Sequence, residues 1–515
     1  MSRKEAISRI IGRILSGEAD IEKIKRESSR EFSTSSIITN PEIIGAFPKD
    51  RLDGRIRELL LKKPAKTLSG VTPVAVMIKP QSSCRWGCIY CPYTGLAAKS
   101  YTGFEPAALR GRQFGFDPYM QASSRVRQYE GGGHPTDKCE VIVMGGTFLE
   151  MDQGYKSSFI KGIYDGLNGF RSETLVRSIE NNEKNRKHRV VGLTIETRPD
   201  VCTDHIGEML SYGATRVELG VQHADDGIYK TINRGHTVKD VTDSTRELKD
   251  AAFKVLYHIM PGLPGSDRGK DIESSRRLFE DESLRPDMLK IYPTLVVGGT
   301  VLKKMMDEGR YTPYSSEEAA DVISEFYRHI PKYVRVMRIQ RDIPADRIDR
   351  GVKKSNLREM VEQRIREKGI RPMEIRCREV GVSRRKAVDM EGFRIERMDY
   401  RASKGKETFL SYENESGLVA GFIRLRIPGE GRRPEITPGT ALIRELHIYG
   451  SEVPIEGDGK VQHRGLGMNL LKEAESNARD LGMTKMVIIS GVGVREYYRR
   501  HGYGLEGPYM AKRLS

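Results

Sequence analysis

The chain has 515 residues, 37% of them hydrophobic and 31% charged, so it can bury a core, and wholesale disorder is excluded. The net charge of +16 favours polyanionic partners such as nucleic acid. No apolar run approaches the roughly eighteen residues of a membrane span. Because the charged N-terminus also lacks a secretory signal, we expect a cytoplasmic protein without membrane contact.

The first 70 residues are expected to form a basic helical appendage. Apolar residues recur there at helical spacing: Ile7, Ile10, Ile11, Ile14 and Leu15. A second basic helix is predicted at 50–62. Residues 1–80 carry a net charge of +6, which predicts a phosphate-facing surface.

Residues 71–340 alternate short apolar runs with helical stretches. The predicted strands are 75–79, 139–146, 190–197, 214–222, 253–263 and 288–295, with helices such as 155–170 and 239–251 between them. This alternation is typical of parallel βα units in an α/β fold. Six or so units indicate a full or partial (β/α) barrel, with its chemistry at the carboxyl ends of the strands.

The remaining chain divides into a connector and a second domain. Residues 341–385 are charged and predict helical connector structure. Residues 386–515 predict a smaller α+β domain, with strands at 407–413, 417–427, 441–450 and 486–491 and a helix at 465–481.

Three of the six cysteines form a CxxxCxxC motif, namely Cys84, Cys88 and Cys91. Clustered cysteines in a chain without a secretory signal indicate metal or cluster ligands rather than disulfides. Three thiolates can hold three irons of a 4Fe-4S cluster, leaving the fourth iron for the amino and carboxylate groups of S-adenosylmethionine (SAM). A structural zinc loop is the alternative, but structural zinc usually takes four ligands. Of the other three, Cys139 and Cys202 are expected to pack in the core, and Cys377 stands alone, so we expect no zinc.

Polar and glycine residues at the ends of later strands are candidates for SAM binding. They are Gly145, Gly146, Thr147, Glu196 and Gln222. Glycines let the backbone approach a ligand, and polar groups at strand ends can face the barrel mouth. As isolated residues they fit a structural role equally well.

A second motif lies near the C-terminus, where Gln462, Gly465 and Gly467 fit the Q/R-x-x-G-x-G/A pattern of GCN5-related acetyltransferases. Such a glycine loop before a helix can cradle the pyrophosphate of CoA. The strand before it carries Glu445, Leu446, His447 and Ile448, and can pair with the pantetheine arm. Tyr498, in YYRRHGY, is typical of a tyrosine at the thioester sulfur. A helix cap with core aromatics is the alternative.

The chain as a whole resembles the elongator protein 3 family. The resemblance runs from about residue 75 to the C-terminus through segments such as KPQSSCRWGCIYCP, IVMGGTF, LTIETRPD, NRGHT, RELHIYGSEVP, QHRGLGM and GVREYYRRHGY. It implies a radical SAM partial barrel followed by a GCN5-related acetyltransferase domain. The implied enzyme is a tRNA carboxymethyluridine synthase, in which a radical formed from SAM takes hydrogen from the methyl group of acetyl-CoA. The resulting carbon radical adds to C5 of the wobble uridine.

The resemblance also implies the site residues and partners. Cys84, Cys88 and Cys91 hold the cluster, and Lys138 is a catalytic residue that contacts acetyl-CoA in the radical half. Leu466 to Met468 and Tyr498 join Glu445 to Ile448 in the acetyl-CoA site of the other half, with Tyr498 catalytic. The implied partners are the anticodon stem-loop of tRNA, an external electron donor, and a second copy or Elongator-like subunits.

Two other functions fit parts of the sequence. A protein lysine acetyltransferase would use the C-terminal motif alone, with the first domain as a scaffold. It would not need an intact CxxxCxxC motif. A non-enzymatic tRNA-binding module would need neither motif, yet both are intact.

Overall fold

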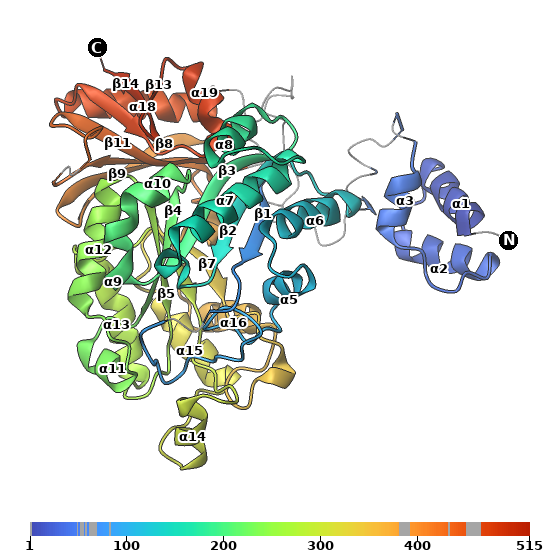
Figure 1. Ribbon diagram of the computed structural model, residues 1–515, viewed down its shortest axis with the longest axis horizontal. Coiled ribbons are helices and arrows are strands. Elements are labelled where there is room, and N and C mark those ends of the chain that lie inside the picture. The colour runs from blue at the N-terminus through green and yellow to red at the C-terminus, as the bar shows by residue number, and fades with distance from the viewer. Residues whose placement is uncertain are drawn as a thin grey trace.

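The computed structural model describes residues 3–48, 50–51, 56, 59–60, 70–81, 84–380, 392–430, 433–449 and 465–514 (Figure 1). Within these residues the chain forms two seven-stranded sheets and a separate helical bundle. The two sheets lie against each other in Figure 1.

The first sheet is wholly parallel, and its strands follow one another in chain order. They are β1 (Thr72–Met77), β2 (Lys138–Met144), β3 (Arg189–Thr197), β4 (Arg216–Gln222), β5 (Lys254–Ile259), β6 (Met288–Ile291) and β7 (Arg335–Ile339). Because β1 and β7 are its two edges, the sheet is an open partial barrel, as predicted. The seventh strand was not predicted, since arginines at Arg335 and Arg338 interrupt its apolar pattern.

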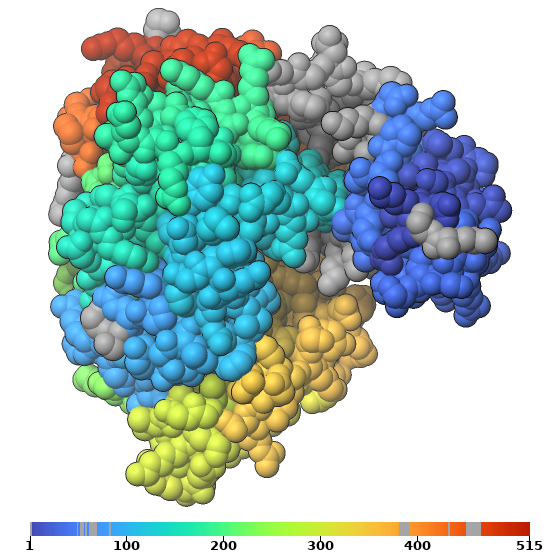
Figure 2. Space-filling model, turned by 45° about the vertical axis from the view of Figure 1, so that its right-hand side comes forward, coloured from blue at the N-terminus to red at the C-terminus, as the bar shows by residue number. Residues whose placement is uncertain are grey.

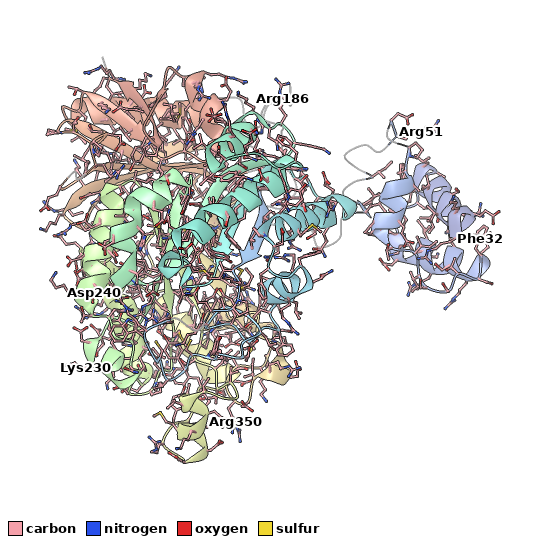
Figure 3. All side chains as sticks on the ribbon, viewed as in Figure 1. Phe32, Arg51, Arg186, Lys230, Asp240 and Arg350 are labelled. Atoms are coloured by element: carbon pink, nitrogen blue, oxygen red, sulfur yellow. The ribbon has the colours of Figure 1, made fainter. Side chains whose placement is uncertain are left out.

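Helices connect the strands and cover the outer face of this sheet (Figure 1). They are α5 (Pro106–Gln113), α6 (Pro118–Gly131), α7 (Gln153–Asn168), α8 (Leu175–Lys184), α9 (Pro199–Cys202), α10 (Ile206–Ser211), α11 (Asp226–Thr231), α12 (Val238–Asp250), α13 (Arg268–Glu280), α14 (Val301–Asp307) and α15 (Ser316–Phe326). Short 3-10 helices are η2 (Phe148–Glu150), η3 (Thr203–His205), η4 (Ala345–Arg347) and η5 (Val492–Val494). Arg186, before β3, and Arg350, after β7, lie at opposite ends of the barrel in Figure 3.

The expected connector packs on the barrel. It contains α16 (Leu357–Glu367) and α17 (Ile375–Arg378), and α16 lies against α15. Val361 and Ile365 belong to the same hydrophobic core as the barrel strands. The apolar residues of this charged helix therefore form one buried face.

The second sheet has the order β13-β14-β12-β11-β10-β9-β8. Its strands are β8 (Arg394–Ala402), β9 (Gly405–Glu413), β10 (Val419–Ile427), β11 (Thr440–Ile448), β12 (Lys485–Ile488), β13 (Gly504–Glu506) and β14 (Tyr509–Arg513), with helices α18 (Leu466–Asp480) and α19 (Arg495–Arg499). All its pairs are antiparallel except β11 with β12. Strands β8, β13 and β14 were not predicted.

The second sheet packs against the amino ends of the barrel strands through buried charges. Arg444 of β11 donates to both carboxylate oxygens of Asp287, directly before β6, at 2.6 and 2.7 Å. Arg426 of β10 donates to Asp250 at the end of α12 at 2.6 Å. These groups are almost fully buried. Because a broken buried ion pair leaves an uncompensated charge, these pairs fix how the two sheets meet.

A glycine at this interface permits a very close backbone approach. A Cβ at Gly491 would lie 2.1 Å from the carbonyl oxygen of Val191 in β3. We expect Gly491→Ala to destabilise the protein by about 3 kcal/mol, the upper part of the range for overpacking. Thermal unfolding checks this, with Gly504→Ala as the control because its Cβ would meet nothing within 4 Å. Equal melting temperatures for the two variants would show that a Cβ at position 491 fits, and would contradict the close approach of Gly491 to Val191.

The N-terminal helices form a small bundle with its own hydrophobic core, built from α1 (Arg3–Leu15), α2 (Ile21–Glu31) and α3 (Asn40–Ala46). Glu42 accepts hydrogen bonds from Arg3 Nε at 2.7 Å and Thr39 N at 2.9 Å. The bundle stands beside α6, where Pro41 is 4.0 Å from a Cβ placed on Gly131 (Figures 1 and 2). The basic helix expected at 50–62 falls largely outside the described residues. None of the described helices has the length and apolarity needed to cross a membrane.

Candidate radical SAM and acetyl-CoA sites

The three motif cysteines lie together at the carboxyl end of the barrel. Cys84, Cys88 and Cys91 all line one cavity of about 380 Å³. Cys88 is buried and the other two are half-buried, and all three are free thiols. Their loop follows β1, and Ile89 N donates to Ile232 O at 3.1 Å. The loop is therefore fixed by backbone contacts from another part of the barrel.

The residues around this cavity fit an iron–sulfur cluster and SAM. Three thiols without disulfide partners suit a cluster with one open iron. Thr147 Oγ1, Thr197 Oγ1 and Arg198 Nη1 are buried, have no hydrogen-bond partner, and belong to residues that line the cavity. Because buried polar groups are normally satisfied, these atoms indicate a polar ligand.

Burial and charge act in opposite directions on the two more enclosed thiols. Burial raises the pKa of the Cys91 thiol to about 11, and the nearby Cys88 adds to this. Burial also acts to raise the pKa of Cys88, but Arg234 and Arg198 outweigh it and lower that pKa below its usual value. The positive groups around Cys88 therefore favour its thiolate, which is the form that binds metal.

Four of the five predicted SAM residues line the cavity, namely Gly146, Thr147, Glu196 and Gln222. Gly146 has open space where a Cβ would stand, so its backbone is accessible. Gln222 has a left-handed φ of 72°, which a residue with a side chain rarely adopts. Such a conformation at a strand end is typical of a functional position.

The fifth residue, Gly145, acts behind the cavity wall. Its φ is +131°, and a Cβ there would lie 2.5 Å from Ile78 Cδ1. Its N–H donates to Glu196 Oε2 at 3.2 Å, and Tyr101 OH donates to the same oxygen at 2.7 Å. Gly145 and Tyr101 therefore orient the Glu196 carboxylate.

The barrel interior carries charges that the sequence analysis did not assign. Glu218 pairs with Lys290 and accepts from His258 Nε2 at 2.7 Å. Burial acts to raise the pKa of the Glu218 carboxyl, but Lys290 and His258 outweigh it and lower that pKa well below its usual range. Glu196, Glu218 and His258 are spaced like metal ligands, yet the Lys290 ammonium supplies the balancing positive charge. The sequence signal that could have identified these residues was the alternation of side chains within the predicted strands, because every second residue of such a strand faces the barrel interior.

In the second domain, β11 and β12 separate after a short paired stretch. They pair only from Thr440 to Ile443 of β11, so Glu445, Leu446, His447 and Ile448 have no partner on that side within the described residues. Glu445 is ion-paired with Arg424 at 2.8 Å, and His447 Nε2 is buried without a hydrogen-bond partner. The free backbone edge can pair with the amide groups of a pantetheine arm.

The first turn of α18 lies beside this separation. Gly465 precedes the helix with a left-handed φ of 97° and provides no side-chain cap. Leu466, Gly467 and Met468 follow as the first helical residues, whose N–H groups have no partner within the helix and can bind phosphate. Gln462 lies outside the described residues.

The two neighbouring tyrosines of α19 have different surroundings. Tyr498 is buried in the core of the second domain, and burial raises the pKa of its hydroxyl. Tyr497, which was not predicted, is half-buried, and its hydroxyl lies 3.0 Å from a Cβ placed on Gly467. Burial raises the pKa of Tyr497 to about 12. Tyr497 therefore contacts the first turn of α18 more directly.

Lys138 does not lie with the other radical-site residues. It is the first residue of β2, paired with Arg189 at the start of β3, whereas Met144 ends β2 at the cavity. Six residues of extended strand separate these ends by roughly 20 Å. Lys138 thus lies at the end of the barrel that faces the second sheet, and its role in acetyl-CoA binding remains a prediction.

The fold and the two sites define a radical SAM enzyme with an added acetyltransferase domain. Residues 78–278 match the Radical SAM superfamily, and residues 286–367 match the Radical_SAM C-terminal domain. The chain is 47% identical to the tRNA uridine(34) acetyltransferase of Methanocaldococcus jannaschii, over 88% of this chain and 87% of that one. It is 39% identical to human Elongator complex protein 3, over 96% and 94% of the two chains.

A solved structure agrees with these relatives. The archaeal Elp3 of Methanocaldococcus infernus with an N-terminal deletion superposes with a TM-score of 0.78 at 44% identity, covering 87% of this chain and all of that chain. The chain belongs to the family of tRNA uridine(34) acetyltransferases and Elongator complex protein 3. The expected family, fold class and cofactors are thereby confirmed, since radical SAM enzymes use SAM and a 4Fe-4S cluster.

Proposed function

We propose that this enzyme modifies uridine 34 of tRNA by a radical reaction that transfers a carboxymethyl group from acetyl-CoA to C5 of the base. The main support is the gathering of Cys84, Cys88 and Cys91 around one cavity with Glu196 and Thr147. The names of the relatives support uridine 34 of tRNA as the substrate, and the separation of β11 from β12 in the second domain supports an acyl-CoA as the acyl donor.

Bound cluster and SAM would supply a one-electron route to a carbon radical, which unactivated carbon atoms require. The chain's own residues then have separable tasks. The three cysteines hold the cluster, while Glu196, oriented by Gly145, and the free groups of Thr147 and Arg198 bind SAM. In the second domain the α18 N-terminus binds the pyrophosphate. Once the carbon–carbon bond to the base has formed, water attacks the thioester carbonyl, the C–S bond breaks, and Tyr498 donates a proton to the departing CoA sulfur.

The shape of the cavity supports cooperation between the two domains. Its lining continues from the cysteines to Pro73 and Ala75, near the amino end of β1. The second sheet packs at the amino ends of the barrel strands. A cavity that runs along the barrel interior brings the radical site toward the domain that binds the acyl donor.

Mass spectrometry of tRNA nucleosides tests this function. Reconstituted protein is incubated without oxygen with tRNA, SAM, acetyl-CoA and a one-electron reductant. We expect 5-carboxymethyluridine at position 34 only when all components are present. Acetylated protein lysines formed without SAM, and unmodified tRNA despite an intact cluster, would instead support the lysine acetyltransferase.

A further inference from the structure

Arg234 is a buried cation beside a motif cysteine. The residue is 7% exposed, its Nη1 donates to Cys88 Sγ at 3.5 Å, and its Nη2 donates to Gly220 O. Its Nε is buried without a partner. In the described part of the chain no carboxylate forms an ion pair with it. A buried guanidinium is costly unless an anion balances it.

The other buried cations of this cavity are already balanced. Arg198 pairs with Asp200 at 2.9 Å, and Lys290 pairs with Glu218. Arg234 differs because the group able to carry negative charge that it hydrogen-bonds is the sulfur of Cys88. The negative charge that would balance Arg234 must therefore come from the side of the cysteine loop.

The segment around Arg234 is built to hold this contact. Ile232 O accepts from Ile89 N at 3.1 Å, and Asn233 Nδ2 donates to Gly87 O at 3.1 Å. A Cβ on Gly235 would lie 2.3 Å from the ring of Trp86, and Arg198 Nη2 donates to Arg234 O at 2.7 Å. We call residues 232–235 the cysteine-loop clasp.

Gly220 on β4 leaves room for the guanidinium. A Cβ there would lie 2.6 Å from Arg234 Nη2. The barrel strand and the clasp together therefore hold Arg234 against Cys88.

We propose that Arg234 is the built-in counter-charge of the iron–sulfur cluster and raises its reduction potential. The proposal rests on the cluster assigned above to Cys84, Cys88 and Cys91. Reduction adds one electron from a low-potential one-electron donor, and no bond forms or breaks. A fixed positive charge and an N–H donor at a ligand sulfur both stabilise the more negative, reduced state. Arg234 is thus a positioning and electrostatic residue of the radical site.

A redox titration followed by electron paramagnetic resonance tests this proposal on the full-length reconstituted protein. Iron and sulfide are quantified first for every variant. We expect Arg234→Met to disfavour reduction about tenfold, which corresponds to a midpoint lower by ~59 mV for one electron. Arg234→Gln keeps a polar head group but no charge and should shift in the same direction. Arg234→Lys keeps the charge and should remain closer to wild type.

Asn233→Ala is the matched control, because it removes a clasp hydrogen bond without changing charge. An unchanged midpoint in Arg234→Met with full iron content would overturn the proposal, as would an equal shift in Asn233→Ala. If Arg234→Met and Arg234→Gln lose the cluster while Arg234→Lys retains it, the positive charge at this position stabilises the cluster, which supports the proposal. If Arg234→Lys loses it too, the role is geometric and the proposal is wrong. A wild-type protein that binds no cluster would instead refute the proposed function.

Discussion

We expect Cys88→Ala to abolish SAM cleavage and to lower the iron bound by the reconstituted protein below the content of a four-iron cluster. This is the largest effect that we expect from one substitution. Cys88 is the buried cysteine of the motif, and it is also the one that Arg234 contacts. Its loss removes a ligand and leaves the guanidinium without the neighbouring sulfur. Cluster binding fails for both reasons.

Cys139→Ala is the control for this experiment. Cys139 is fully buried on β2, and its Sγ donates to Thr136 O at 3.4 Å. Its replacement removes a small packing group, which destabilises by about 1 kcal/mol but leaves the cluster in place. Iron content and production of 5'-deoxyadenosine are the two measurements. A full cluster in Cys88→Ala, with SAM still cleaved, would show that other residues hold the iron.

The apolar strands of the barrel were accessible to sequence analysis, whereas strands with charged residues were not. β2 and β3 read as β-branched, apolar runs, and they form where predicted. β8 reads RIERMDYRA and was not predicted. It is the edge strand of the second sheet, where charged side chains face solvent and protect against edge pairing. Charge in this stretch therefore reflects its position at the sheet edge.

The sequence motif identified the cysteines, but the groups that control them lie far away in the chain. Arg234 is 146 residues from Cys88. Glu218 and Lys290 pair across the barrel interior although 72 positions separate them. Such contacts depend on strand order and register, which local periodicity does not encode. The distance of Lys138 from the radical site was unpredictable for the same reason. Lys138 begins β2, and its place beside the second sheet follows from how the two sheets pack and not from the local sequence.

Tyr498→Phe is expected to lower acetyl-CoA-dependent tRNA modification by about 100-fold, a typical loss for a general acid. The buried hydroxyl has a raised pKa, so Tyr498 stays protonated through the neutral and mildly alkaline range and can donate its proton to a thiolate. No group in the described residues hydrogen-bonds this hydroxyl, so its removal should leave stability unchanged. Cluster content should also remain at the wild-type level, because the substitution lies in the second domain.

The variant Tyr497→Phe tests whether proton donation belongs to Tyr498 or to the neighbouring tyrosine that lies closer to α18. The Tyr497 hydroxyl faces Gly467 on the first turn of α18, so its loss should raise the KM for acetyl-CoA while kcat changes little. Steady-state kinetics on both variants, with melting temperatures as the folding control, distinguish the two tyrosines. If Tyr497→Phe instead lowers kcat and Tyr498→Phe does not, the proton donor is the half-buried tyrosine that touches α18. Tyr498 would then serve only to pack α19 against the core.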